Sequence, residues 1–226
     1  MREREFDAIL FDMDGTLVDS EELHTLAWVK LLESFGHAPP AADWADSFMG
    51  EPDSQSLRNI VAMFPDLADK GDILEVKQRI FRDLVAERGG AIAMPGVHTP
   101  LRQLAAAGYP MAVGTNGVLA NCRAVLKAAG LLHYFATLAT FDQVKNGKPA
   151  PDIYRAAAKR LGFPPERCIV VEDSDTGAKS GKAAGCFVVG VASSHPPQRL
   201  ETADAVLSDT EAALDWIVDR LASAAR

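Results

Sequence analysis

From Tyr109 onward, short apolar runs alternate with helical segments, and this alternation limits the folds that the chain can adopt. The apolar runs are YPMAVGT, FATLAT, CIVVED, CFVVGVA and ADAVLS. Between them lie segments such as LANCRAVLKAAG and APDIYRAAAKRLG, whose apolar residues recur at helical spacing. Strands that alternate with helices predict a parallel sheet with helices on both faces. The apolar run from Phe6 to Phe11 is expected to form a further strand of this sheet.

Between this first strand and Met94 the pattern is helical. The segments EELHTLAWVKLLESFG, DSQSLRNIVAMF and DILEVKQRIFRDLVAERGG are amphipathic and show no strand alternation. The predicted fold class is therefore α/β, a doubly wound, Rossmann-like parallel sheet with a small all-helical cap domain inserted after the first strand. We expect the α/β catalytic core to comprise residues 1–19 and 95–226, and the cap domain to comprise residues 20–94.

Charge and composition exclude some classes of partner. The formal net charge of −8 argues against general affinity for nucleic acid, which requires a basic surface. No apolar run approaches the roughly 20 residues that span a membrane, and the charged start MREREFD does not resemble a signal peptide. Cys122, Cys168 and Cys186 are expected to be buried thiols. We expect a cytoplasmic monomer with no nucleic-acid or membrane partner.

Polar residues follow the predicted strands at their carboxyl ends, where open α/β sheets bind ligands. They are Asp12 and Asp14 after the first strand, Thr115 and Asn116 in GTNG, Lys148 in KNGKPAPD, and Glu172 and Asp173 in EDSDTG. Two carboxylates as close as those of Asp12 and Asp14 repel each other unless a cation or a shared proton intervenes. Acids, a hydroxyl, amides and a lysine together suit a metal ion and a phosphate.

These motifs resemble, in order, those of the haloacid dehalogenase-like hydrolases, a large family of aspartate-nucleophile phosphatases. DMDGTLVDSE is similar to the first motif, AVGTNG to the second, GKPAPDIY to the third and VVEDSDTGAKSGKAAG to the fourth. The helical insertion resembles that of the subgroup with a small helical cap, which includes β-phosphoglucomutase and phosphoglycolate phosphatase. The resemblance implies a Mg²⁺-dependent phosphatase that acts on a small phosphorylated metabolite, a sugar phosphate or a related acid.

The residue types indicate how that chemistry would proceed. A phosphate monoester is dianionic, so a carboxylate can attack it only where a cation such as Mg²⁺ neutralises the repulsion. Asp12 is the candidate nucleophile that forms an aspartyl phosphate, and Asp14 is the candidate acid and base for the leaving group and the water. Thr115 and the amides around Asn116 are expected to bind phosphoryl oxygens. Lys148 is expected to stabilise the charge of the transition state.

The predicted metal ligands are Asp12, Asp14, Glu172 and Asp173. Asp173 is expected to bind the metal, and Glu172 to support it directly or through water. In the family that the motifs resemble, the backbone carbonyl at the position of Asp14 also contacts the metal. Ser174 is expected to cap the following helix rather than bind the metal.

Substrate choice is expected to depend on the cap. His24 resembles a hinge histidine of the β-phosphoglucomutase subgroup, or is a polar helix residue at the domain edge. Gly50 matches the position of the substrate-recognition loop of that subgroup. The mutase pattern has an arginine shortly after this glycine, whereas this chain has Asp53 in that register. Lys77 is expected to reach the active site, or to be solvated.

Other functions fit less well. The alternative is a phosphomutase of the β-phosphoglucomutase kind, which His24 favours and Asp53 opposes. Phospho-acceptor receiver domains are about half this length and have their acceptor on a middle strand. A dinucleotide-binding protein would need G-x-G-x-x-G after the first strand, which is absent here. A dehalogenase or phosphonate hydrolase of the same family would lack an acid at the position of Asp14.

Overall fold

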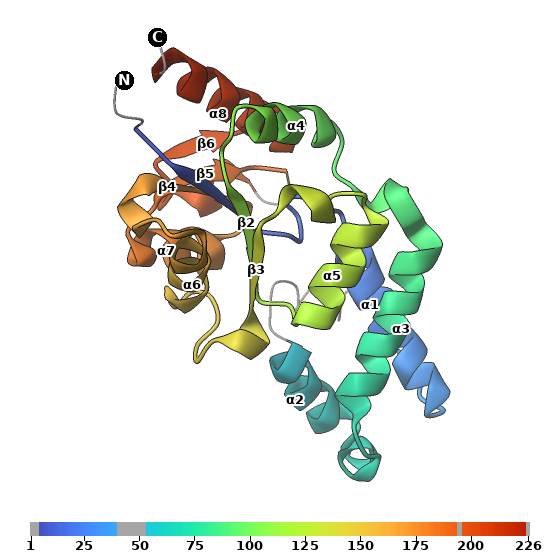
Figure 1. Cartoon of the computed structure of the whole chain (residues 1–226). Coiled ribbons are helices and arrows are strands. Elements are labelled where there is room, and N and C mark those ends of the chain that lie inside the picture. Colours follow the sequence, from blue (N-terminus) through green and yellow to red (C-terminus); the bar gives the residue numbers. More distant parts are fainter. Residues whose placement is uncertain (1–4, 40–52, 194–195, 225–226) are drawn as a thin grey trace.

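The computed structural model describes residues 5–39, 53–193 and 196–224. Its centre is a six-stranded sheet in which all paired strands are parallel, in the order β3-β2-β1-β4-β5-β6 (Figure 1). The strands are β1 (Ala8–Phe11), β2 (Met111–Thr115), β3 (Thr137–Thr140), β4 (Cys168–Glu172), β5 (Phe187–Val191) and β6 (Ala205–Leu207). Because β1 lies between β2 and β4, the strand order reverses beside it, and such a switch point opens a crevice at the carboxyl ends of the strands.

The sheet register aligns those carboxyl ends. Phe11 pairs with Val113 on one side and with Val171 on the other, so the residues that follow β1 lie beside the ends of β2 and β4. Thr115 pairs with Thr140 at the end of β3. The polar residues predicted to meet at the strand ends are thereby placed along one edge of the sheet.

Helices cover both faces of the sheet. They are α4 (His98–Ala106), α5 (Leu119–Ala128), α6 (Asp152–Leu161), α7 (Asp175–Ala184) and α8 (Thr210–Ala224). Along β1, Ile9 and Phe11 pack in one buried cluster with residues of α4, α5 and α8, whereas Ala8 and Leu10 pack in a second with residues of α6 and α7. The period-2 alternation of a strand buried on both faces explains this division. The predicted α/β fold is confirmed.

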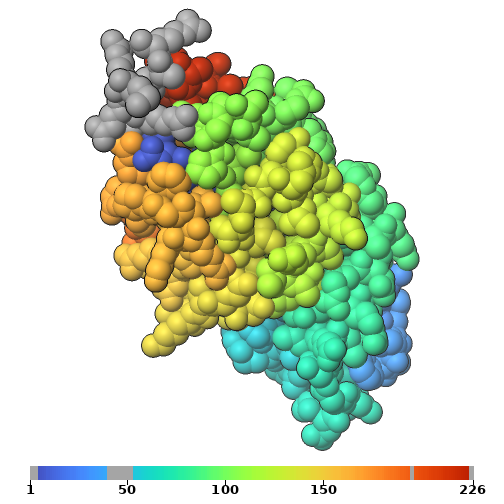
Figure 2. All heavy atoms as spheres, viewed as in Figure 1, coloured from blue at the N-terminus to red at the C-terminus, as the bar shows by residue number. Residues whose placement is uncertain are grey.

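Between β1 and α4 lie the helices α1 (Glu21–Ser34), α2 (Asp53–Met63) and α3 (Ile73–Arg88). They have an apolar cluster of their own, which contains Trp28, Leu31, Leu32, Ile60, Leu67 and Ile73. Figure 1 shows them grouped beside α5, and Figure 2 shows their surface continuing from that of α5. The helical insertion is therefore observed, while the division at residues 19/20 and 94/95 stays a prediction.

Short 3₁₀ turns connect several of these elements. They are η2 (Pro65–Asp69), η3 (Gly89–Ile92), η4 (Leu132–Tyr134), η5 (Phe141–Gln143), η6 (Pro165–Arg167) and η7 (Pro197–Leu200). All three cysteines are buried and free, as predicted. Within the described ranges, no helix combines the length and the apolar character needed to cross a membrane.

Candidate active site

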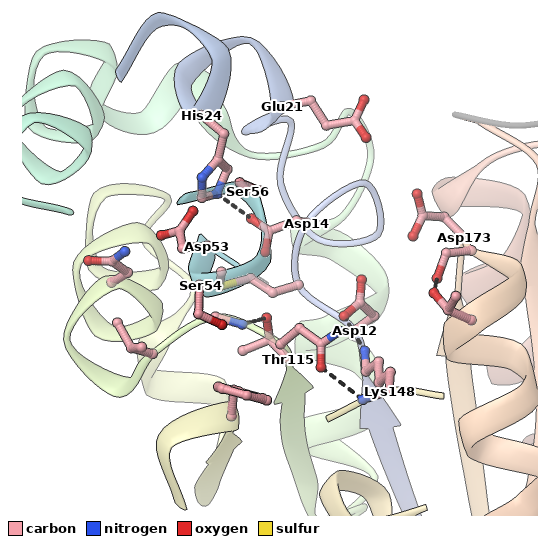
Figure 3. A pocket seen from close by; sticks show the side chains of 18 of the residues that line it. Asp12, Asp14, Glu21, His24, Asp53, Ser54, Ser56, Thr115, Lys148 and Asp173 are labelled. Atoms are coloured by element: carbon pink, nitrogen blue, oxygen red, sulfur yellow. Dashed lines mark hydrogen bonds and ion pairs between the residues drawn. The ribbon is translucent and has the colours of Figure 1, made fainter. Parts of the chain in front are cut away.

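A tight turn after β1 gives Asp12 and Asp14 different neighbours. The backbone amide of Asp12 donates to Val171 O at 2.9 Å, which fixes it beside the end of β4. The chain then turns back at Gly15, which has a φ of 79° and donates its amide to Val18 O at 2.8 Å. Glycine adopts this left-handed conformation without steric cost. Asp12 consequently faces the ends of the neighbouring strands, whereas Asp14 faces the cap (Figure 3).

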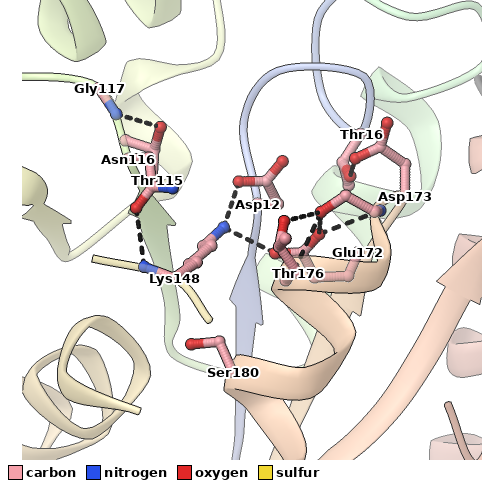
Figure 4. A network of polar contacts seen from close by, with 12 residues as sticks. Asp12, Thr16, Thr115, Asn116, Gly117, Lys148, Glu172, Asp173, Thr176 and Ser180 are labelled. Carbon is pink, nitrogen blue, oxygen red and sulfur yellow. Dashed lines mark hydrogen bonds and ion pairs between the residues drawn. The ribbon is translucent and has the colours of Figure 1, made fainter. Parts of the chain in front are cut away.

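Lys148 joins the carboxylates of two strand ends. Its Nζ donates to Asp12 Oδ1 at 2.5 Å and to Glu172 Oε1 at 2.6 Å, and all three residues are buried (Figure 4). Burial alone would lower the pKa of Lys148, but the two carboxylates outweigh it and raise that pKa above the usual lysine value. The lysine therefore carries a fixed positive charge next to the candidate nucleophile.

Three buried acids form a candidate metal site. Ligand oxygens of Asp12, Glu172 and Asp173 all lie within 4.8 Å of one another. Burial, followed by the charge of Glu172, raises the pKa of Asp12 well above its ordinary value despite the nearby lysine. Three carboxylates around the single ammonium of Lys148 leave an excess of negative charge, and burying such charge is costly unless it is compensated. A hard divalent cation with oxygen ligands, such as Mg²⁺, fits this donor set.

The turn after β4 orients the acids of that strand. Ser174 caps α7, as predicted, because its hydroxyl accepts from the amide of Gly177 at 3.0 Å. The Ser174 hydroxyl also donates to Glu172 Oε2 at 3.1 Å. A Cβ atom at position 177 would collide with the Glu172 side chain. Gly177 is therefore required for the position of Glu172, a role that was not predicted from the sequence.

Asn116 links the end of β2 to the loop that precedes α6. Its Oδ1 accepts from the backbone amide of Lys148 at 2.9 Å, and the Lys148–Pro149 peptide bond is cis. A Cβ atom at Gly147 would lie 2.6 Å from that same oxygen, so glycine permits the close approach. Thr115 is buried, and its hydroxyl accepts from the Gly117 amide at 2.9 Å. Both Thr115 and Asn116 line the pocket, where their predicted phosphate contacts stay a prediction.

Asp14 lies apart from the acidic cluster. Its Oδ1 accepts a hydrogen bond from the Ser20 hydroxyl and lies 3.9 Å from His24 Nε2. The Asp14 carboxylate is therefore not placed to bind the metal. A metal contact through the Asp14 backbone carbonyl stays a prediction. Burial raises the pKa of Asp14, although Ser20 and the two lysines Lys148 and Lys77 oppose the shift. A raised pKa favours the protonated form of the carboxyl group, which is the form that a proton donor needs.

His24 connects Asp14 to the cap. The ring stacks on Phe81 with centroids 4.0 Å apart, and Nδ1 lies 2.9 Å from Lys77 Nζ. Burial, followed by the charge of Lys77, lowers the pKa of His24 well below 6.5. A neutral ring accepts from the lysine through Nδ1 and presents an N–H at Nε2 toward Asp14.

Lys77 is fully buried, so the alternative of a solvated lysine is wrong. Its Nζ donates to Asp53 Oδ1 and lies 5.0 Å from the centre of the Trp28 ring. Lys77 thus contacts two residues that line the pocket, His24 and Asp53, but does not line the pocket itself. Its direct contact with the substrate stays a prediction. Gly50 lies outside the described residues.

One pocket joins these parts. It encloses about 990 Å³ between the strand ends and the cap helices. Asp12, Thr115, Lys148 and Asp173 line one end. The cap contributes other lining residues, which include His24, Trp28, Asp53, Ser54 and Phe81. The site is therefore a chamber whose base holds the acids and Lys148, and whose walls include residues of the helical insertion.

Two further residues act on the site and were not predicted. The Tyr154 hydroxyl donates to Glu172 Oε1 at 2.6 Å, and the centre of its ring lies 4.8 Å from Lys148 Nζ. The Thr16 hydroxyl donates to Asp173 Oδ1 at 3.5 Å. The GKPAPDIY motif contained Tyr154 in the first turn of a helix, but helical periodicity predicts only that its side chain is buried and not where its hydroxyl points.

Known proteins resemble this chain in both sequence and structure. The family model for the haloacid dehalogenase-like hydrolases matches residues 6–185. Hexitol phosphatase A of Escherichia coli K12 is 37% identical over 202 residues, which cover 89% of this chain and 90% of that protein. The crystal structure of β-phosphoglucomutase from Clostridium difficile has a TM-score of 0.82 at 25% identity, covering 96% and 98% of the two chains. CbbY from Rhodobacter sphaeroides in complex with xylulose-(1,5)bisphosphate has a TM-score of 0.78 at 28% identity, covering 91% and 95%.

Proposed function

Since this chain belongs to the haloacid dehalogenase-like hydrolases, we propose that it is a Mg²⁺-dependent phosphatase that hydrolyses a small sugar phosphate or related acid through a phosphoryl-aspartate. The match to a hydrolase family and the similarity to a protein named as a phosphatase support phosphoric monoester hydrolysis. The proposal rests on the contact of Lys148 with Asp12 and Glu172, and on the closeness of Asp173 to both acids. The 2.5 Å contact between Lys148 Nζ and Asp12 Oδ1 places positive charge where a phosphoryl group would meet a carboxylate.

The first half of the reaction uses both aspartates. Asp12 attacks phosphorus, and the bond from phosphorus to the leaving oxygen breaks while Asp14 gives that oxygen its proton. Lys148 and Thr115 hold phosphoryl oxygens as the negative charge moves onto them. Mg²⁺ held by Asp12 and Asp173, with Glu172 beside it, would neutralise the repulsion between the phosphate and the attacking carboxylate.

The second half restores the enzyme. Asp14, now ionised, takes a proton from a water molecule that attacks phosphorus. The bond from phosphorus to Asp12 breaks, inorganic phosphate leaves, and both carboxyl groups return to their starting states. The Ser20 hydroxyl holds the Asp14 carboxyl group on the cap side of the pocket, with the His24 ring 3.9 Å away.

A phosphomutase of the β-phosphoglucomutase kind is the second candidate, favoured by the structural similarity to such an enzyme and by the position of His24. A panel of hexose, pentose and hexitol phosphates distinguishes the two functions when both free phosphate and isomerised sugar phosphate are measured. We expect release of phosphate that stops when EDTA removes Mg²⁺. Isomerisation faster than hydrolysis would favour the mutase. Turnover that is equal with and without EDTA would contradict the metal-dependent reaction.

A further inference from the structure

The cap end of the pocket contains a pair of opposite charges. Asp53 is the first residue of α2 and lines the pocket, with 19% of its side chain exposed. Its Oδ1 accepts a hydrogen bond from Lys77, whose side chain is fully buried in α3. The positive charge of Lys77 is therefore cancelled by a carboxylate that lines the pocket.

The described cap helices bring no other cation to the pocket. Among the described residues that line the pocket, the cations are Lys148, Lys179 and Arg199, and none of these belongs to α1, α2 or α3. Lys148 is bound to Asp12 at the base, and Lys179 pairs with Asp175 at 2.6 Å on α7. The described cap helices therefore offer a bound substrate no uncompensated positive charge.

The remaining groups at the cap end suit hydroxyls. Within the described ranges Asp53 Oδ2 accepts no hydrogen bond from the protein, and a carboxylate oxygen accepts strongly from an O–H donor. Ser54, Ser56 and Gln78 add neutral polar groups, and Trp28 adds an apolar ring face. Figure 3 shows Asp53 beside His24 and Asp14, on the side of the pocket away from Lys148.

We infer that Asp53 is a specificity-determining residue, whose carboxylate cancels the charge of Lys77 and accepts a hydroxyl from the uncharged, polyhydroxylated part of the substrate. The enzyme would then select monophosphates of neutral polyols or sugars. It would discriminate against substrates that carry a second phosphate or a carboxylate at the cap end, because like charges repel. This inference rests on the proposed phosphatase function.

The test compares two substrates that share a six-carbon chain and one phosphate. Glucitol 6-phosphate has a hydroxyl at the far carbon, and 6-phosphogluconate has a carboxylate there. p-Nitrophenyl phosphate serves as a third substrate, because it has no polyhydroxylated part. Values of kcat/KM are measured for the wild type and Asp53→Asn. Asp66→Asn is the matched control, since it removes a cap carboxylate that pairs with His37 and does not line the pocket.

We expect the wild type to prefer glucitol 6-phosphate. Asp53→Asn should reduce the ratio of kcat/KM for glucitol 6-phosphate over 6-phosphogluconate by about tenfold or more, the usual worth of a hydrogen bond to a charged group. Its activity toward p-nitrophenyl phosphate should fall by a smaller factor than its activity toward glucitol 6-phosphate, and Asp66→Asn should keep the wild-type ratio. An unchanged ratio in Asp53→Asn would overturn the inference. So would a parallel loss on all three substrates.

A second variant covers the case in which Asp53→Asn does not fold because Lys77 is left unpaired. The double variant Asp53→Asn/Lys77→Gln removes both charges, so it should lose activity toward glucitol 6-phosphate without gaining activity toward 6-phosphogluconate. Retention of the full wild-type preference would overturn the inference. If the wild type releases phosphate from none of the three substrates, the failure lies instead with the proposed phosphatase function.

Discussion

Tyr154 Oη and Lys148 Nζ donate to the same oxygen, Glu172 Oε1, each at 2.6 Å. Gly114 permits this arrangement, because a Cβ atom there would lie 2.9 Å from the Tyr154 ring. Glu172 is thus fixed between a neutral donor and a cationic one. Glu172 in turn holds Lys148, which contacts Asp12. The position of Lys148 therefore depends indirectly on Tyr154.

Tyr154→Phe tests this relationship, because it removes the hydroxyl and leaves the ring beneath Lys148. We expect the free energy of unfolding to fall by about 1–3 kcal/mol, since a buried hydrogen bond to a carboxylate is lost. We also expect kcat to fall several-fold with little change in KM, because Tyr154 positions the site and does not line the pocket. Tyr134→Phe, in η4, is the control. Wild-type stability and kcat in Tyr154→Phe would show that the shared oxygen has no such role.

The acidic cluster predicts that Mg²⁺ stabilises the protein. A ligand that binds only the folded state adds about 2.7 kcal/mol at 100 times its dissociation constant. Thermal unfolding followed over a Mg²⁺ titration should therefore show a rising Tm in the wild type. Asp173→Asn should reduce that rise, because it removes one of the buried ligands. Asp175→Asn, which alters the exposed acid paired with Lys179, should respond to Mg²⁺ as the wild type does. Equal responses of all three proteins would argue against the site.

His24 predicts a pH dependence of stability. Its folded pKa lies well below the 6.5 of a free histidine, chiefly because of burial. Between those two values the unfolded chain binds more protons, so stability is present above pH 6.5 and is lost as the pH falls toward the folded pKa. His24→Gln should therefore lose less unfolding free energy than the wild type between pH 7 and pH 5. Because 33% of the side chain is exposed, solvent should weaken the effect.

The control for this experiment is His133→Gln, which replaces an exposed histidine outside the site. It should follow the wild-type pH dependence, because it retains His24. A His24→Gln protein whose denaturation midpoint falls with acid as steeply as that of the wild type would contradict a neutral, partly buried imidazole at this position.

Much of this architecture could be predicted from the sequence. The alternation of strands and helices determined a parallel sheet, and the carboxyl ends of such strands share an edge, so Asp12, Lys148, Glu172 and Asp173 were expected to meet there. The pairing of Lys77 with Asp53 could not be predicted in this way. It depends on the packing of α2 against α3, and periodicity predicts which face of each helix is buried but not which polar atoms meet.

Asp14 shows a second limit of the sequence pattern. Its spacing from Asp12 placed both residues at the same strand end, yet its carboxylate turns toward Ser20 and His24. The turn at Gly15, with its positive φ, sends the two side chains to different neighbours. The glycine was visible in the sequence, but the direction of the turn depends on hydrogen bonds to Val18 and Met13 that form only in the folded chain.

The division of roles between Asp12 and Asp14 predicts distinct kinetic failures. Asp14→Asn cannot transfer protons, so its rate on alkyl phosphates should fall on the order of 10²–10⁴-fold. The loss should be smaller on aryl phosphates, whose leaving groups need little protonation. Asp12→Asn should abolish turnover of both kinds of substrate while the protein stays folded, because it lacks the attacking carboxylate.

Intact-protein mass spectrometry of Asp14→Asn, quenched rapidly after mixing with an aryl phosphate and Mg²⁺, tests the proposed mechanism most directly. Attack by Asp12 should still occur, while water cannot be activated. The phosphoryl-enzyme should therefore accumulate, and the intact protein should gain the mass of one phosphoryl group. The double variant Asp12→Asn/Asp14→Asn should show no adduct. Absence of the adduct from Asp14→Asn, together with equal losses on aryl and alkyl phosphates, would contradict the account.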